Sequence, residues 1–367
     1  MTSMRAILIA ALMLGLGATV IPARADEPTT TRKVVLEKTG SGRYRWKLIE
    51  ARVPKVGAHQ VLVRMRAVAL NRGDLEMLAP DERRDHSGRV VASDGAGDVV
   101  TVGKSVEGIR PGQRVTSLYF RNWTDGTPSP EIFLGAHGFN IDGVLGDYIV
   151  LDDTAVAPVP EILSYEEAAT LPTAGLTAWM ATLGQRELHR GDVVLVQGTG
   201  GVSMFALQFA AASGAKVIVT SSSDEKLKRA KALGADDGIN YRTTPAWAER
   251  VMELTKNHGA DLVVDVGGKE TLALSVASLA YAGTLSVVGG LTGYGGDIPS
   301  LGLLMKTARA QGVFVGSRSD FLRMSDFISK HRLRPAIDSK FPVERYQDAL
   351  DLMQSGNFVG KIVLQLQ

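Results

Sequence analysis

The amino-acid sequence predicts an α/β protein in which a doubly wound parallel sheet is joined to a mostly β domain. The chain has 367 residues, 45% hydrophobic and 22% charged, a length and composition that suit two folded domains. After about residue 164, continuous apolar runs alternate with helical patterns, as in a parallel sheet covered on both faces. Before that point, short β-type runs are separated by glycine and proline, which favours a mostly β domain.

The first 25 residues are predicted to be an export signal and are set apart from the fold. Met1–Arg5 is short and positive, residues 6–20 are apolar or small, and Ala23-Arg24-Ala25 has the small residues of a cleavage site. The apolar run is shorter than the roughly 20 residues of a membrane span. We therefore expect cleavage after Ala25, a periplasmic or secreted protein, and no stable membrane insertion. The alternative is an uncleaved anchor.

The balance of residue types excludes several classes of function. Lysine and arginine number 41 and aspartate and glutamate 39, without a long basic block, so no nucleic-acid partner is expected. The absence of cysteine removes disulfides, thiolate nucleophiles and cysteine-bound zinc. The six histidines are scattered without ligand spacing and are expected on the surface or in loops, so no metal site is predicted.

The order of the elements follows from these patterns. In the mostly β part, strands are expected near residues 34–36, 60–65, 97–102, 113–115 and 147–151, with a long aperiodic loop over 121–140. In the second part, strands are expected over 193–196, 216–219, 262–266, 284–288 and 312–315. One helix starts near Val202, and another near Trp247 follows a Thr244 cap with Pro245 in its first turn. The tail has a helix over 346–353 and a strand over 361–366.

A glycine turn follows the first strand of the second part. Val193–Gln197 is a buried strand, and Gly198, Gly200, Gly201 and Val202 form the turn and the helix start. Gly200 lets the backbone approach a pyrophosphate, whose charge the helix N-terminus favours. Ser203 replaces a third glycine and is small enough for close packing of helix on strand. The alternative is a glycine turn that binds nothing.

The residues after the second strand favour NADPH over NADH. An NAD site places a carboxylate there, whereas this chain has Thr220-Ser221-Ser222-Ser223 with Lys226 behind it. Hydroxyls and a cation suit a 2′-phosphate, which a carboxylate would repel. The alternative is that Ser223 only caps a helix and Lys226 is solvated.

The chain resembles the zinc-free, quinone-oxidoreductase-like and alcohol dehydrogenase-like branch of the medium-chain dehydrogenase/reductase superfamily. The resemblance covers nearly all of the chain after the export signal. It rests on the glycine turn and on six further segments, residues 69–75, 94–100, 111–115, 171–179, 230–236 and 360–363. It implies a GroES-like catalytic domain over 26–160, a Rossmann domain over 161–318, and a return to the catalytic domain over 319–367.

The resemblance also implies roles for individual residues. Ser222, Lys226 and Tyr241 look like the contacts of the 2′-phosphate, and Thr177 looks like the residue that approaches the nicotinamide and its ribose. The loops that line the cofactor are expected to contribute Gly267, Gly289, Gly290, Leu291, Val315 and Ser317. Lys361 looks like a further contact on the cofactor side of the cleft.

Zinc-dependent relatives hold their catalytic metal through a cysteine in the region of Asn71 and a histidine at the position of Ser93. Without that Lewis acid, hydride delivery to an electrophilic quinone or α,β-unsaturated carbonyl is favoured over alcohol oxidation. Asn71 is expected to polarise the acceptor carbonyl and Asp74 to order it, the alternative being a simple turn between strand and helix. Tyr119 and Trp123 are expected to wall the acceptor pocket, the alternative being core packing.

Three functions remain open at this stage. The first is an NADPH-dependent reductase of quinones or enones, the second a zinc-free NADP-dependent alcohol dehydrogenase-like enzyme, and the third an exported protein that binds a nucleotide or apolar ligand without turnover. Export counts against the first two because no NADPH pool is expected outside the cytoplasm, and the intact cofactor residues count against the third. Relatives are commonly dimers, so a homodimer through the strand near residues 312–315 is expected by analogy.

Overall fold

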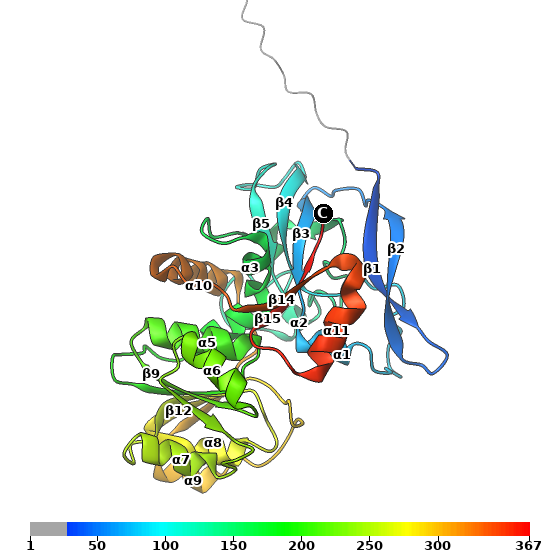
Figure 1. Cartoon of the computed structure of the whole chain (residues 1–367). Coiled ribbons are helices and arrows are strands. Elements are labelled where there is room, and N and C mark those ends of the chain that lie inside the picture. Colours follow the sequence, from blue (N-terminus) through cyan, green and yellow to red (C-terminus); the bar gives the residue numbers. More distant parts are fainter. Residues whose placement is uncertain (1–27) are drawn as a thin grey trace, which may run out of the picture.

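A computed structural model describes residues 28–367 as two domains joined side to side (Figure 1). The predicted export signal lies outside the described residues. Within residues 28–367, no helix has the length and apolar character to cross a membrane. One apolar cluster runs from strand β3 (Gln60–Ala69) of the mostly β domain through helices α4 (Leu176–Ala181) and α5 (Gly201–Ala212) to strand β8 (Val193–Gln197), so both domains share a continuous core.

The lower domain in Figure 1 contains a six-stranded parallel sheet, which confirms the predicted fold class. The strands lie in the order β10-β9-β8-β11-β12-β13, so the direction of winding reverses between β8 and β11. Their bounds are β8 Val193–Gln197, β9 Lys216–Ser221, β10 Asp237–Asn240, β11 Ala260–Asp265, β12 Leu279–Val287 and β13 Arg309–Gly312. The helices of this domain are α5 Gly201–Ala212, α6 Asp224–Ala232, α7 Trp247–Leu254, α8 Leu272–Ser278 and α9 Ser300–Met305.

The mostly β domain has a seven-stranded sheet, in which six strands follow the order β14-β15-β3-β4-β5-β7 and the seventh, β6, pairs with β3. A separate β1-β2 hairpin accompanies it. Its strands are β1 Thr30–Lys38, β2 Tyr44–Arg52, β3 Gln60–Ala69, β4 Asp94–Val102, β5 Arg114–Ser117, β6 Tyr148–Asp152, β7 Val156–Pro158, β14 Ile337–Pro342 and β15 Lys361–Gln365. The helices outside the parallel-sheet domain are α1 Arg72–Glu76, α2 Pro130–Phe133, α3 Tyr165–Ala169, α4 Leu176–Ala181, α10 Arg318–His331 and α11 Tyr346–Ser355.

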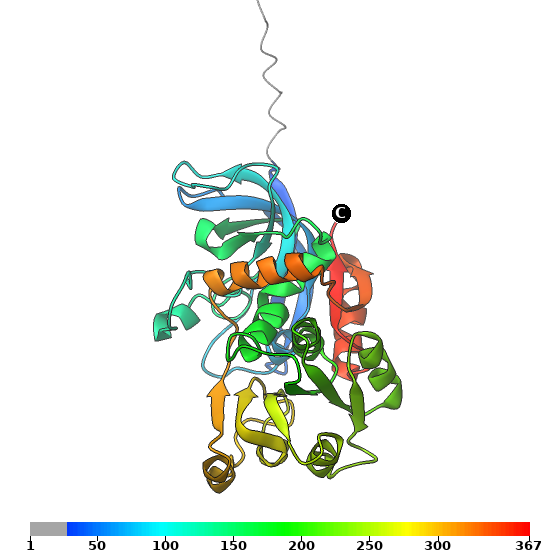
Figure 2. The ribbon, with the colours of Figure 1, turned by 90° about the vertical axis from the view of Figure 1, so that its left-hand side faces the viewer.

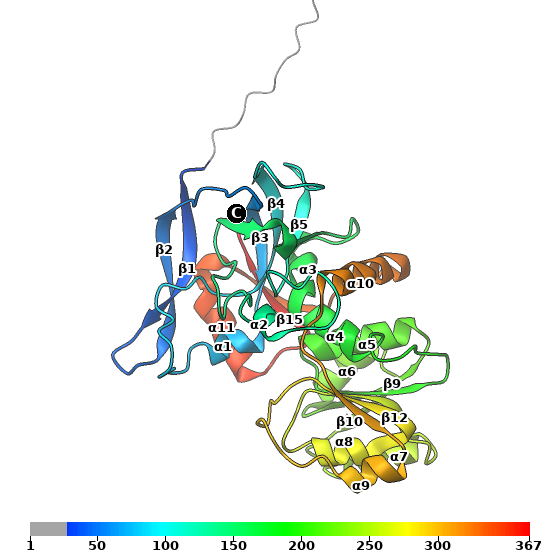
Figure 3. The same ribbon diagram turned by 180° about the vertical axis from the view of Figure 1, so that it is seen from behind.

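The C-terminal segment closes the mostly β domain after the parallel sheet is complete. β15 pairs antiparallel with β3, and the segment is coloured red beside the blue strands in Figures 2 and 3. Just before β15, Gly360 forms a bridge with Gly200, and the Gly360 N–H donates to the Thr199 carbonyl at 2.9 Å. The last strand of the chain therefore touches the glycine turn of the other domain.

One predicted helix cap and one predicted strand are wrong in position. The helix near Trp247 is confirmed, since α7 begins at that residue, but Thr244 does not cap it, because the Thr244 N–H donates to the Asn240 carbonyl in a turn. The last parallel strand covers Arg309–Gly312 instead of 312–315, and all four of its residues are exposed. Val315 has a φ of +55°, which ends the extended chain after Val313. The polar sequence of β13 carries no apolar run that could have indicated a strand.

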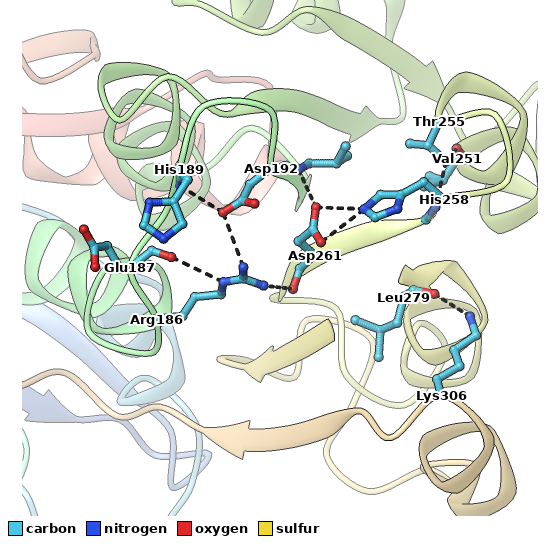
Figure 4. A network of polar contacts seen from close by, with 12 residues as sticks. Arg186, Glu187, His189, Asp192, Val251, Thr255, His258, Asp261, Leu279 and Lys306 are labelled. Atoms are coloured by element: carbon cyan, nitrogen blue, oxygen red, sulfur yellow. Dashed lines mark hydrogen bonds and ion pairs between the residues drawn. The ribbon is translucent and has the colours of Figure 1, made fainter. Parts of the chain in front are cut away.

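A polar network ties the start of β8 to the start of β11, on the edge of the sheet away from the glycine turn (Figure 4). Asp261 accepts the Val193 N–H at 2.8 Å and contacts His258 Nε2 at 3.2 Å. Arg186 donates to the Asp261 carbonyl at 3.2 Å and to the Asp192 carboxylate at 3.4 Å. These contacts hold two central strands in register at one end and leave the other end for a ligand.

Two of the histidines, His86 and His137, are buried, although both lie in loop segments between named elements, as the sequence predicted. His137 Nδ1 lies 2.9 Å from the Leu118 carbonyl, and His86 Nε2 lies 2.9 Å from Asp81. Each histidine is thus used by a local hydrogen bond. Within residues 28–367, no three His, Cys, Asp or Glu side chains gather as a metal-binding group.

Candidate active site

The glycine turn connects β8 to α5 and faces open space. Gly198 has a φ of +71°, which allows the chain to turn directly after the strand. A β-carbon on Gly200 would meet no atom within 4 Å, so this side of the turn is free for a ligand. Ser203 is buried, and its Oγ donates to the Gln197 carbonyl at 2.7 Å. Serine therefore provides the close helix-to-strand packing that was expected of it.

Ser222, Lys226 and Tyr241 lie around the ends of two paired strands. Ser222 follows β9, and the Tyr241 N–H after β10 donates to the last residue of β9 at 3.0 Å. Lys226 Nζ donates to the Gly356 carbonyl at 2.5 Å, and burial lowers the pKa of Lys226. The ring of Tyr241 is 42% exposed. The structure thus brings the three predicted 2′-phosphate contacts to one edge of the sheet.

Arg242 adds a cation at this edge that the sequence reading did not single out. Burial is the largest cause that lowers the pKa of Lys226, and the charge of Arg242 is the second. The two cations therefore lie close enough to interact electrostatically. The acid at the start of α6, Asp224, is already paired with the Asn240 amide at 2.9 Å. The only signal for Arg242 in the sequence is its place directly after Tyr241.

The loops after β11 and β12 are joined at the point where the winding of the sheet reverses. The Thr292 N–H donates to the Gly267 carbonyl at 2.8 Å, and the Leu291 N–H donates to Val266 at 3.2 Å. Gly289 and Gly290 precede this contact, so the predicted loop residues do gather at one edge. Leu291 is 56% exposed and points out of the core. This is the edge at which open parallel sheets bind nucleotides.

A buried carboxylate organises these loops. Asp265, at the end of β11, accepts from the Gly268 N–H at 2.9 Å and from Ser275 Oγ at 2.6 Å. It also accepts from Gln197 Nε2 at 3.1 Å, which links it to the last residue of β8. The strand ends on both sides of the predicted cofactor crevice are therefore fixed by one fully hydrogen-bonded group.

The segments predicted to meet the nicotinamide come from α4 and from the turn before α10. Thr177 on α4 is 6% exposed. Val315 is held at a positive φ of +55°, an uncommon conformation for a β-branched residue. Ser317 is buried, and its Oγ donates to Asp320 Oδ2 at 2.6 Å in a capping box for α10. The Ser317 hydroxyl is thus committed to the helix cap, although its backbone lies in the predicted segment.

Three polar side chains from separate parts of the chain meet beside the glycine turn. Ser93 Oγ lies 3.4 Å from Thr173 Oγ1 and 3.5 Å from Asn71 Nδ2. Thr173 belongs to a single π-helical turn, Leu171–Gly175, a local geometry often found at functional sites. The sequence reading named Asn71 and Ser93 but missed Thr173, whose only signal was its place in the segment 171–179.

Asp94 hydrogen-bonds to two of these three side chains, Ser93 and Thr173. The carboxylate is completely buried and accepts Ser93 Oγ at 2.6 Å, Thr173 Oγ1 at 2.6 Å and the Thr173 N–H at 2.9 Å. Both hydroxyl hydrogens are therefore used, and both hydroxyl oxygens are left with lone pairs. The amide nitrogen of Asn71 is the polar group of the cluster with hydrogens to spare, since its contact with Ser93 is long.

Lys361 and Asp74 complete the site. Lys361 is 3% exposed, and its Nζ donates to Asn71 Oδ1 at 2.6 Å and to the Leu70 carbonyl at 2.5 Å. Burial lowers the pKa of Lys361, while the carboxylates of Asp94 and Asp74 oppose this shift. Burial raises the pKa of Asp74 to about 7, although the Asn71 N–H donates to its Oδ2 at 2.7 Å. Asp74 thus orders the backbone of Asn71, and Lys361 contacts its side chain.

A pocket of about 700 Å³ lies on the side of the site where Phe139 packs against Gly73 of α1. One wall is aromatic and the other carries the charged residues 81–84, and none of Asn71, Ser93 and Thr173 lines it. Tyr119, Phe120, Phe133, Phe139 and Phe314 contribute its rings, and Phe139 reaches back toward α1. Burial is the largest cause that raises the pKa of Tyr119, and the charges of Asp94 and Asp74 are the next two. The phenol therefore lies near the polar cluster. Among the residues that the structure describes, no partner hydrogen-bonds the Tyr119 hydroxyl.

Trp123 does not line the pocket that Tyr119 lines. It is buried, its Nε1 donates to the Gly126 carbonyl at 2.9 Å, and its ring contacts Phe120 with centroids 5.7 Å apart. Its own carbonyl accepts the Arg318 N–H at 2.9 Å. The structure therefore uses Trp123 to pack the long loop against the start of α10, which is the alternative that the sequence left open.

Two family profiles match this chain. One, described as an alcohol dehydrogenase GroES-like domain, covers residues 57–161, and the other, described as a zinc-binding dehydrogenase, covers residues 201–330. The zinc-type alcohol dehydrogenase-like protein C1773.06c of Schizosaccharomyces pombe is 41% identical over 335 residues, which are 89% of this chain and 96% of that protein.

Solved structures agree with this assignment. A protein from Sinorhizobium meliloti 1021 superposes with a TM-score of 0.87 at 39% identity, over 93% of this chain and 100% of that one. An NAD-dependent alcohol dehydrogenase gives a TM-score of 0.80 at 32% identity, over 92% and 100% of the two chains. The quinone oxidoreductase from Coxiella burnetii gives 0.72 at 25% identity, also over 92% and 100%. The chain belongs to the medium-chain dehydrogenase/reductase superfamily and is an oxidoreductase of that family.

Proposed function

We propose that the protein is an NADPH-dependent, zinc-independent reductase of quinones or α,β-unsaturated carbonyl compounds. The observation that carries this proposal is the cluster of Asn71, Ser93 and Thr173, an amide and two hydroxyls, beside the glycine turn and an aromatic pocket. The names of relatives support both quinone and alcohol chemistry, so the choice between them rests on these side chains.

The residues present fit NADPH. The open side of Gly200 and the N-terminus of α5 would hold the pyrophosphate, and Ser222, Lys226, Tyr241 and Arg242 would hold the 2′-phosphate. The reduced nicotinamide, when bound, supplies a hydride. The chain itself contributes the crevice between β8 and β11, and Thr177 and Val315 at its nicotinamide end.

Two donors are free to stabilise the acceptor oxygen. Asn71 Nδ2 has only a long contact with Ser93, and the Tyr119 hydroxyl has no partner among the described residues. When the acceptor gains a hydride at carbon, its oxygen becomes negative, and N–H and O–H donors in a desolvated pocket stabilise that charge. Solvent then supplies the proton. The rings of Tyr119 and Phe139 provide flat apolar walls for a planar acceptor.

The donors at the expected zinc position do not fit zinc. Zinc in proteins is bound by thiolate, imidazole or carboxylate, whereas Asn71, Ser93 and Thr173 offer an amide and two neutral hydroxyls. The ammonium of Lys361 lies 2.6 Å from Asn71 Oδ1 and would repel a second cation. These two observations support the zinc-independent branch, and no step of the proposed reaction passes through a metal.

A second candidate is a zinc-free alcohol dehydrogenase-like activity. The hydroxyl oxygens of Ser93 and Thr173 present lone pairs backed by Asp94, and such oxygens could accept the proton of a substrate alcohol. The names of the Schizosaccharomyces pombe relative and of the NAD-dependent structure both mention alcohol dehydrogenase, the first as a zinc-type protein, and so support alcohol chemistry but not the absence of zinc. The absence of a Lewis acid from this proposed mechanism makes oxidation the slower direction.

The proposed function is tested by titrating purified protein starting at Asp26 with NADPH and NADH while nicotinamide fluorescence is followed. A small quinone, a conjugated enone and a simple alcohol with NADP⁺ are then added in parallel after chelation of metals. Tight NADPH binding followed by oxidation with quinone or enone is the expected result. Turnover only with the alcohol would support the second candidate, and failure to bind either nucleotide would contradict both.

We also propose that the protein is exported and forms a homodimer. Cleavage after Ala25 would leave Asp26 as the first residue, and mass spectrometry of protein isolated from its native host tests this directly. The dimer is proposed through the exposed edge strand β13 and the exposed apolar side chains of α9. Small-molecule acceptors are the other expected partners.

A further inference from the structure

Lys361 is a buried cation that contacts both the glycine turn and the polar cluster around Asn71. It is the first residue of β15, directly after the bridge between Gly360 and Gly200. Its aliphatic carbons lie against the start of α5, because a β-carbon on Gly201 would come within 2.5 Å of Lys361 Cδ. Its ammonium lies on the other side, 2.6 Å from Asn71 Oδ1 and 2.5 Å from the Leu70 carbonyl.

The contacts of Asn71 allow only one orientation of its amide. An ammonium can donate but cannot accept, so the group that faces Lys361 has to be the amide oxygen. On the other side, Ser93 Oγ gives its hydrogen to Asp94 at 2.6 Å and can only accept, so the group that faces Ser93 has to be the amide nitrogen. The two constraints are independent and agree.

We infer that Lys361 is a positioning residue that fixes the Asn71 amide so that its N–H, and not its carbonyl, faces the acceptor oxygen. This inference rests on the proposed function, in which Asn71 is the donor to that oxygen. Without Lys361, the Asn71 amide would be oriented only by the long contact with Ser93 and by its capping-box contact with the Asp74 backbone. A flipped amide would place a lone pair against the developing negative charge. Because Lys361 also contacts Gly201, the orientation of Asn71 is tied to the turn that would hold the cofactor.

The test is a double-mutant cycle on turnover with Lys361→Met, Asn71→Ala and the double variant. Lys361→Met is expected to lower kcat for quinone reduction by about 10-fold or more, with smaller changes in acceptor KM and NADPH affinity. If Lys361 acts through Asn71, Lys361→Met has less than about a twofold further effect in the Asn71→Ala background. Effects that multiply in the double variant would overturn the inference.

A second variant separates hydrogen bonding from charge. Lys361→Gln keeps an uncharged N–H donor that is one bond closer to the backbone than the ammonium. A longer hydrogen bond to Asn71 Oδ1 is therefore expected, and the variant should keep more turnover than Lys361→Met. Equal loss in both variants would also overturn the inference, since it would show that the buried charge and not the hydrogen bond matters. NADPH affinity and melting temperature, measured for each variant, distinguish lost turnover from lost folding.

Lys306→Met is the matched control. Lys306 is also a lysine whose pKa burial lowers, and its Nζ donates to the carbonyls of Ala277 and Leu279 at 2.7 and 2.6 Å. Figure 4 shows the contact with Leu279, which begins β12 and so lies at the opposite end of the parallel strands from the glycine turn. It is expected to lower stability and leave kcat unchanged. A wild-type protein that reduces no quinone or enone would contradict the proposed function, whereas an active wild type with an unchanged Lys361→Met would contradict only the role of Lys361.

Discussion

Gly201 and Lys361 are in such close contact that a β-carbon on Gly201 would lie 2.5 Å from Cδ of the lysine. The neighbouring glycine of the same turn, Gly200, would direct a β-carbon into open space. Two adjacent glycines therefore serve different purposes. Gly201 leaves room for the strand that returns from the end of the chain, and Gly200 leaves room for a ligand.

Gly200→Val is expected to fold but to lose both nicotinamide nucleotides. A β-carbon at position 200 meets no protein atom within 4 Å and Gly200 has a φ of −74°, so the expected cost to the fold is about 1 kcal/mol for a poorer helix cap. The same side chain occupies the place of the pyrophosphate, and binding should weaken by about 100-fold or more. Fluorescence titration with NADPH and NADH, together with a melting curve, checks both parts. Unchanged binding would refute the assignment of the turn.

Lys226→Ala is expected to separate the two nucleotides. NADPH affinity should fall by about 10-fold or more, because one cation of the 2′-phosphate site is lost, and NADH affinity should change less than about twofold. Lys228→Ala on the exposed face of the same helix is the matched control, and it should change neither affinity. Equal losses for both nucleotides would show that Lys226 does not read the 2′-phosphate.

Asp74→Asn is expected to change how stability depends on pH. Burial raises the pKa of Asp74 to about 7, above its ordinary value of 3.8, so the folded protein binds a proton that the unfolded chain releases between these pH values. The Asp74 contribution to stability is therefore present below about pH 4 and is lost as pH rises to 7, by up to about 1.4 kcal/mol per unit.

Asparagine at position 74 can still accept the Asn71 N–H and carries no charge. Urea unfolding from pH 4 to pH 8 should show the variant gaining stability relative to wild type as pH rises. Parallel curves for the two proteins would mean that Asp74 ionises as readily in the folded state as in the unfolded chain.

The parts of the fold that could be predicted from the sequence are those whose burial leaves a pattern. The runs of β8, β9 and β11 are apolar throughout because both faces of these strands are covered, and they were placed to within a few residues. β13 was misplaced because a strand with four exposed residues, Arg309–Gly312, has no such pattern. The predicted Thr244 cap of α7 is wrong because this residue, which resembles a helix cap, belongs to the turn after Asn240.

The site was predictable only where its residues lie in contiguous segments. The glycine turn is a local pattern and could be read directly. Thr173 and Asp94 are 79 residues apart, and their contact depends on how the π-helical turn packs on β4. The orientation of Asn71 depends on Lys361, which is 290 residues away. Such relationships are set by tertiary packing, and no local spacing reports them.

The edge of the parallel sheet gives a last prediction, for the proposed homodimer. Among residues 28–367, β12 is the one strand that pairs with β13, so the other edge of β13 is left for a second copy. Nearby, Leu301, Leu304 and Met305 on α9 are 66–71% exposed, an apolar surface that a monomer rarely leaves uncovered.

Leu301→Glu with Leu304→Glu should convert a dimer into a monomer, because charge at the contact would be buried without a partner. Leu134→Glu, at an exposed leucine by the aromatic pocket, is the control and should leave the mass unchanged. Light scattering on a sizing column measures the mass of all three proteins, and a wild-type mass of one chain would remove the dimer from the proposal.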